Sequence, residues 1–123
     1  MTETTTLTPS EQQALQSLVA SIYQLAPEQI ESIALFGSKS RGDSSEDSDI
    51  DVLIIIKKED RDLRREILRQ AARISLDYDV LLSPRVIGSD RWRRMRDFSF
   101  YRNIQRESVK LGLSEDARTE KAA

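Results

Sequence analysis

The sequence contains no cysteine and no histidine. Without cysteine there can be no disulfide, no thiol nucleophile and no thiolate metal site. Without histidine, imidazole zinc sites and Ser-His-Asp triads are excluded as well. Any chemistry must therefore depend on carboxylates, hydroxyls, lysine, arginine and the backbone, together with the hard metal ions that carboxylates prefer.

Long apolar runs are also missing. The longest, Val52 to Ile56, is far shorter than the roughly 20 residues that a membrane-crossing helix needs. The N-terminal sequence MTETTTLTPSE has neither the basic start nor the apolar segment of an export signal. We therefore expect a cytoplasmic protein with no membrane partner.

The 123 residues suffice for one domain and are too few for two independent cores. The formal net charge of −2 argues against a nucleic-acid partner. Charge is unevenly distributed, however, because residues 1–60 hold eleven acids and four bases, whereas residues 61–123 hold ten acids and fifteen bases. Seven arginines between Arg85 and Arg106 form either a solvated helix face or a surface for an acidic partner or polyphosphate.

The spacing of apolar residues predicts a mixture of helices and strands. A capping box at Thr8 and Glu11 begins a helix that ends near Ala26. Further helices are predicted over residues 60–75, 89–95 and 98–111, and strands over residues 32–36, 50–56 and 76–82. This order is typical of an α/β (α+β) domain, with a small mixed β-sheet of about three to four strands covered by helices. We expect residues 1–113 to form this single domain and residues 114–123 to be a flexible tail.

Two short motifs point to chemistry. Gly37-Ser38 directly follows the first predicted strand, where a glycine lets backbone N–H groups and the Ser38 hydroxyl approach a phosphate. Asp49 and Asp51 lie at the start of the second strand, so both carboxylates project from one face, roughly 7 Å apart at Cα. Such a pair can hold magnesium ions that also bind substrate phosphates. Each motif alone is more typical of a turn or of solvated acids, but together they favour a nucleotide site, because a buried Asp51 needs compensation.

The pattern Gly37-Ser38, ten intervening residues and Asp49-x-Asp51 resembles the signature of the DNA polymerase β superfamily of nucleotidyltransferases, and the chain looks like its minimal (MNT) branch. The resemblance implies the polymerase-β-like nucleotidyltransferase fold. It also implies a Mg²⁺-dependent enzyme that transfers a nucleoside monophosphate, AMP from ATP, to an acceptor hydroxyl and releases pyrophosphate.

The same resemblance assigns site residues. Two Mg²⁺ ions would be bridged by Asp49 and Asp51, and a third acid is expected on the neighbouring strand. Asp79 fits that place because it directly precedes an apolar run, while Asp77 is a rival that would share its strand face. The ATP phosphates would be bound by Gly37, Ser38, Lys39 and Arg41, although simple exposure is an equal alternative for Lys39.

A partner is implied as well. In the MNT family the protein is often an MntA-like antitoxin of a HEPN-domain ribonuclease toxin, which it binds and in some cases adenylylates on a tyrosine. Since this chain has no HEPN half, we expect that toxin in trans. Two alternatives stay open: a small-molecule nucleotidyltransferase of the aminoglycoside-modifying kind, and a non-catalytic protein that keeps the fold and neutralises a partner through its arginine-rich C-terminal helices. The arginines from Arg91 to Arg106, together with Trp92, are predicted to form much of the surface that docks an acidic protein partner. The sequence leaves the acceptor, the nucleotide preference and the oligomeric state undetermined, and an oligomer is compatible with it.

Overall fold

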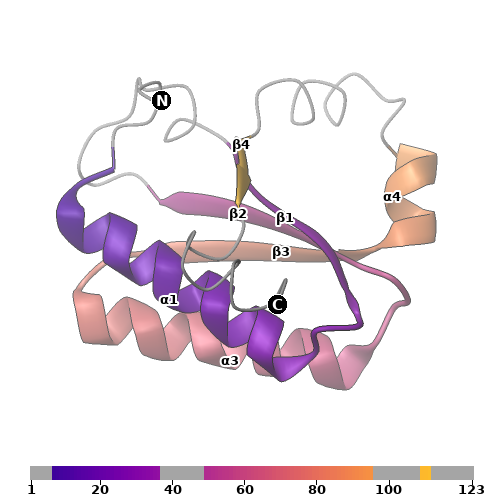
Figure 1. Cartoon of the computed structure of the whole chain (residues 1–123), viewed down its shortest axis with the longest axis horizontal. Coiled ribbons are helices and arrows are strands. Elements are labelled where there is room, and N and C mark those ends of the chain that lie inside the picture. Colours follow the sequence, from indigo (N-terminus) through magenta and orange to yellow (C-terminus); the bar gives the residue numbers. More distant parts are fainter. Residues whose placement is uncertain (1–6, 37–48, 96–108, 112–123) are drawn as a thin grey trace, which may run out of the picture.

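The computed structural model describes residues 7–36, 49–95 and 109–111. They form α1 (Pro9–Leu25), β1 (Ile30–Phe36), β2 (Ile50–Ile56), α3 (Arg61–Tyr78), β3 (Leu82–Gly88), α4 (Ser89–Met95) and β4 (Val109–Leu111). The strands make one sheet in the order β3-β2-β1-β4, in which β2 and β3 are parallel and the other neighbours antiparallel (Figure 1). The predicted small mixed sheet with covering helices is therefore confirmed.

One face of the sheet is covered by α1 and α3, which lie side by side (Figure 1). The predicted capping box begins α1: the Glu11 N–H donates to Thr8 Oγ1 at 3.1 Å, and the Thr8 N–H donates to Glu11 Oε1 at 2.9 Å. Between helices and sheet lies the main core, in which Leu18 of α1, Ile54 of β2 and Ile67 of α3 are fully buried. Burial of such apolar side chains is the main force that holds the helices to the sheet.

The other face of the sheet carries a second, smaller cluster. It contains Phe36, Leu53, Ile55, Ile87 and Trp92, with Met95 packed against it. Successive side chains of a strand point to opposite faces, so the even-numbered residues of β2 face α1 and α3 and the odd-numbered ones face this second cluster. Asp51 is one of the odd-numbered residues, which puts it on the face away from α1 and α3.

The strand predicted over residues 76–82 is wrong, because α3 continues through Tyr78. The apolar side of the helix extends one turn beyond Ile74 to Tyr78, which packs against the core. The helix then ends at Asp79, whose φ of 55° and ψ of 49° are left-handed. The third strand is instead β3, which passes through Pro84. A proline normally ends a strand, but β3 is an edge strand in which the Pro84 nitrogen can turn away from β2, where no N–H is needed.

The helix predicted over residues 98–111 is wrong at its C-terminal end. Val109–Leu111 forms β4, which pairs antiparallel with β1, so that Leu111 lies opposite Ile33. The rest of that prediction, residues 98–108, lies outside the described residues, as does the predicted tail at 114–123. The helix predicted over residues 89–95 is confirmed as α4. None of the helices within the described residues is long and apolar enough to cross a membrane.

The free edge of β3 is partly closed by neighbouring side chains. Ile50 of β2 donates its N–H to the Leu81 carbonyl at 2.8 Å. From Leu81 through β3, the N–H and C=O groups of odd-numbered residues therefore point toward β2, and those of even-numbered residues point outward. Of the outward groups, the Leu82 N–H donates to Ser75 Oγ at 3.1 Å, and Pro84 has no N–H. An edge treated in this way is a poor template for a further strand.

A charged network completes this edge at the end of β3. The Gly88 N–H donates to Glu59 Oε2 at 2.9 Å, and Arg64 donates to Glu59 Oε1 at 2.7 Å and to the Val86 carbonyl at 2.8 Å. The pKa of Glu59 is held below its usual value, chiefly by the Gly88 N–H, with burial opposing and Arg64 and Arg91 assisting. The network ties the residues before α3 to the end of the edge strand.

Replacing Glu59 by Gln should lower the free energy of unfolding by about 1 kcal/mol near neutral pH, because the Gly88 and Arg64 bonds to a carboxylate are weakened. Since the folded pKa is lowered, the carboxylate stabilises the fold above the unfolded pKa of about 4.3, and this contribution is lost as the pH falls through the folded value. In urea unfolding, the difference in free energy of unfolding between wild type and Glu59→Gln should therefore become smaller as the pH falls below 4.

Glu28→Gln is the control, because Glu28 is an exposed residue of the connection between α1 and β1. Its free energy of unfolding should follow that of the wild type. An equal loss in both variants, or a difference for Glu59→Gln that grows in acid, would contradict the role given to the network.

Candidate functional site

Asp49 and Asp51 lie where β2 begins. Ile50 between them is fully buried against α1 and α3, so Asp51, as its neighbour in the strand, projects from the opposite face. Asp49 directly precedes the strand and is exposed, whereas Asp51 is half-buried. The two carboxylates are thus carried at the start of a rigid central strand, at the edge of the second apolar cluster.

The end of β1 lies beside this pair. Phe36, the last residue of β1, is opposite Asp51 in the antiparallel ladder. The chain therefore leaves the sheet next to Asp51 and re-enters it at Asp49. The sequence between these points, 37–48, lies outside the described residues, and it contains all four predicted phosphate-binding residues: Gly37, Ser38, Lys39 and Arg41. Their role stays a prediction.

The two candidates for the third carboxylate are not on a strand. Asp77 belongs to the last turn of α3, and Asp79 caps that helix with its N–H bonded to the Ser75 carbonyl. Both are exposed, and the strand face that they were expected to share does not exist. The connection from Asp79 nevertheless leads to the candidate site, because Leu81 accepts the N–H of Ile50, next to Asp49. Whether Asp79 or Asp77 is a ligand stays a prediction.

The described acids offer a pair of metal ligands rather than a triad. Within residues 7–36, 49–95 and 109–111, no three acidic, cysteine or histidine side chains are placed to hold one metal ion. Asp49 and Asp51 fit Mg²⁺ as a partial set, because this ion takes carboxylate oxygens and usually completes its octahedral shell with water and phosphate oxygens. Two carboxylates would leave most positions of such a shell to water and phosphate oxygens.

Two residues of β3 share the face of Asp51 and were missed in the sequence. In the parallel ladder Ser83 lies opposite Asp51, and Arg85 lies opposite Leu53. Residues opposite one another in a ladder project from the same face of the sheet. They were missed because the third strand was predicted six residues too early; the β-branched pair Val86-Ile87 is the signal that could have located it.

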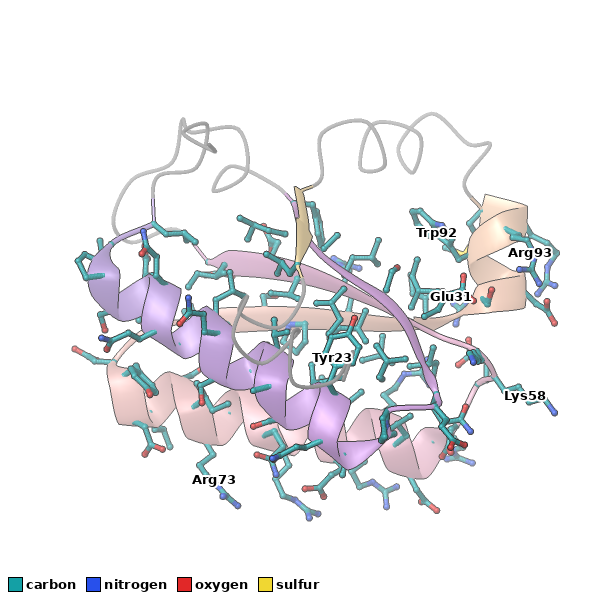
Figure 2. The ribbon with its side chains drawn as sticks, in the orientation of Figure 1. Tyr23, Glu31, Lys58, Arg73, Trp92 and Arg93 are labelled. Carbon is teal, nitrogen blue, oxygen red and sulfur yellow. The ribbon has the colours of Figure 1, made fainter. Side chains whose placement is uncertain are left out.

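The predicted docking surface around Trp92 is not supported at that residue. Trp92 is only 7% exposed and belongs to the second cluster, and Figure 2 shows it on the side of α4 that faces the strands. Of its neighbours, Arg93 forms an ion pair with Asp90, and Arg91 lies 3.9 Å from Glu59. Arg94 is exposed, and three further members of the run lie outside the described residues: Arg96, Arg102 and Arg106.

Known proteins share this arrangement. The sequence profile of the family described as polymerase beta, nucleotidyltransferase, matches residues 20–87, which is more than half of the chain. This chain belongs to that family. The matched residues include β1, β2 and all of β3 except Gly88, and therefore the whole of the candidate site.

Two proteins of Methanocaldococcus jannaschii are similar in sequence. The "putative protein adenylyltransferase MJ0604" is 31% identical over 98 residues, which are 80% of this chain and 94% of that protein. The "putative protein adenylyltransferase MJ0141" is 41% identical over 68 residues, 51% of this chain and 65% of that protein, so this match spans just under two thirds of the relative.

The fold is similar to a solved structure described as a "putative minimal nucleotidyltransferase". The TM-score is 0.54 at 21% sequence identity, over 80% of this chain and 94% of that one. The polymerase-β-like nucleotidyltransferase fold that the sequence predicts is therefore confirmed.

Proposed function

We propose that this chain is a Mg²⁺-dependent nucleotidyltransferase that transfers AMP from ATP to a hydroxyl group of a protein. The proposal depends on one observation above all: Asp49 and Asp51 lie at the start of β2, beside the point where the chain leaves β1 with Gly37-Ser38. This is the order of residues that the family signature requires. The description of two relatives as protein adenylyltransferases favours a protein acceptor over a small molecule.

Each site residue has a chemical task in this proposal. Asp49 and Asp51 would hold two Mg²⁺ ions, and Ser38 with the neighbouring backbone N–H groups would bind the β and γ phosphates. Bound there, Mg²⁺ would neutralise charge on the phosphates and lower the pKa of the acceptor hydroxyl. Arg41 can bind phosphate oxygens bidentately, and Lys39 can add a point charge. Transfer forms a bond from the acceptor oxygen to the α phosphorus and breaks the bond to pyrophosphate.

The acceptor that fits best is a tyrosine of a HEPN-domain toxin supplied in trans, with this chain acting as the antitoxin. Support comes from the membership of the chain in this family and from its likeness to minimal nucleotidyltransferases. Trp92 is buried, so the proposal places no docking surface for this partner at that residue.

Calorimetric titration with ATP tests the aspartate pair. Asp49→Asn or Asp51→Asn should weaken binding in Mg²⁺ by at least about tenfold, because each removes a carboxylate ligand, and should change little in EDTA. Thermal stability of Asp49→Asn without metal should hold or rise, since one of two neighbouring negative charges is removed. Asp62→Asn, an exposed acid on α3, is the matched control. Equal affinities in wild type and both site variants would refute the assignment.

A second measurement decides between Asp79 and Asp77. Asp79→Asn keeps a residue that tolerates the left-handed conformation, so it should fold normally and bind ATP, yet abolish transfer from labelled ATP. Asp79→Gly should be equally inactive and slightly more stable, because glycine adopts this conformation without strain. Asp77→Asn should be milder. If Asp77→Asn is the inactive variant and Asp79→Asn is active, the third carboxylate is Asp77.

The acceptor is tested with a HEPN-domain toxin, if the genes flanking this one encode one. Mixed with wild type, ATP and Mg²⁺, the purified toxin should gain the mass of one or more AMP groups on tyrosine, and Asp51→Asn should add none. The toxin with that tyrosine replaced by Phe is the control. AMP found on a small molecule in the same mixture, with an unmodified toxin, would instead support the small-molecule alternative.

A further inference from the structure

Arg85 is an unusual residue for its place in the fold. It is the one basic residue in the strands β1, β2 and β3, whose other charged residues are Glu31 and Asp51. Its side chain is exposed, although Val86 and Ile87 beside it are buried. We therefore ask what an arginine side chain does at this position of β3, a strand with no other charged residue.

Protection of the sheet edge does not explain this arginine. Charged residues on edge strands commonly prevent another strand from pairing. In β3, however, the outward N–H groups of Leu82 and Gly88 are already bonded to Ser75 and Glu59, and Pro84 has none. Arg85 is an odd-numbered residue, so its backbone groups face β2 and offer no pairing position on the outer edge that its side chain would need to guard.

The register places Arg85 near the aspartate pair. Ser83 lies opposite Asp51, and Arg85 follows on the same face, opposite Leu53. Strands lie about 5 Å apart and alternate residues of a strand about 7 Å apart, so Arg85 and Asp51 are diagonal neighbours within the span of an arginine side chain. Within the described residues Arg85 forms no ion pair, in contrast to Arg64 and Arg93.

We propose that Arg85 binds the phosphate groups of the nucleotide from the β3 side of the site. The inference rests on the proposed function. Arg85 stands on β3, which flanks β2 on the side opposite β1, so a triphosphate held at Asp49 and Asp51 is contacted from the β3 flank. Guanidinium is suited to this task because it bonds two phosphate oxygens at once and stays charged at any physiological pH.

Titration calorimetry with ATP and Mg²⁺ tests the assignment. Arg85→Met should weaken binding by about five- to twentyfold, the loss typical of a hydrogen bond to a charged group. Arg85→Lys should recover part of the affinity, because it keeps the charge and loses the bidentate geometry. Arg73→Met is the matched control: Arg73 is also an exposed arginine, on α3, and Figure 2 shows it pointing away from the sheet. Its affinity should stay within about twofold of wild type.

The outcomes separate this inference from the proposed function. If wild type does not bind ATP and Mg²⁺, both are overturned. If binding is lost in Asp51→Asn but unchanged in Arg85→Met, the proposed function stands and the role of Arg85 is overturned. Equal losses in Arg85→Met and Arg73→Met would also overturn it, since they would reflect net charge alone. Melting temperatures establish that the variants are folded, and Arg85→Gln replaces Arg85→Met if the latter is not.

Discussion

The alternation of side chains along β2 is the constraint on which the rest of the structure depends. Four side chains of β2 are fully buried on the side of α1 and α3: Ile50, Val52, Ile54 and Ile56. Asp51 must therefore project from the opposite face of the sheet. A slip of one residue would turn that carboxylate into an apolar core, where an unpaired charge is very costly. The apolar contacts that stabilise the domain therefore also determine the face from which Asp51, a candidate catalytic residue, projects.

The mixed direction of the strands gathers the site at one end of the sheet. Because β1 and β2 are antiparallel, the end of β1 meets the start of β2; because β2 and β3 are parallel, the start of β3 meets it from the other side. α3 makes the crossover that parallel pairing requires. Residues remote in sequence, from Phe36 to Arg85, are thus brought to one place by backbone pairing alone.

Local signals predicted α1, β2 and α4 well, because a capping box, a β-branched run and short-range apolar spacing act within the element itself. They failed where tertiary context decides. Tyr78 remains helical because it packs on the core, and Pro84 is tolerated because its strand lies at an edge. The spacing of residues in the sequence was enough to predict the pair Asp49 and Asp51. The position of Arg85 near Asp51 depends on the register between β2 and β3, which the sequence alone does not give. The burial of Trp92 likewise depends on the second cluster.

The closure of the β3 edge also limits how these molecules can assemble. A sheet that grows through many copies needs two receptive edges on each copy, one to accept a strand and one to be accepted. In the order β3-β2-β1-β4, three of the four outward positions of β3 present no free N–H, so backbone pairing is left to the side of β4. Within the described residues, assembly by strand addition at the β3 edge is therefore disfavoured, and the contacts that anchor this edge to α3 also limit sheet growth on that side.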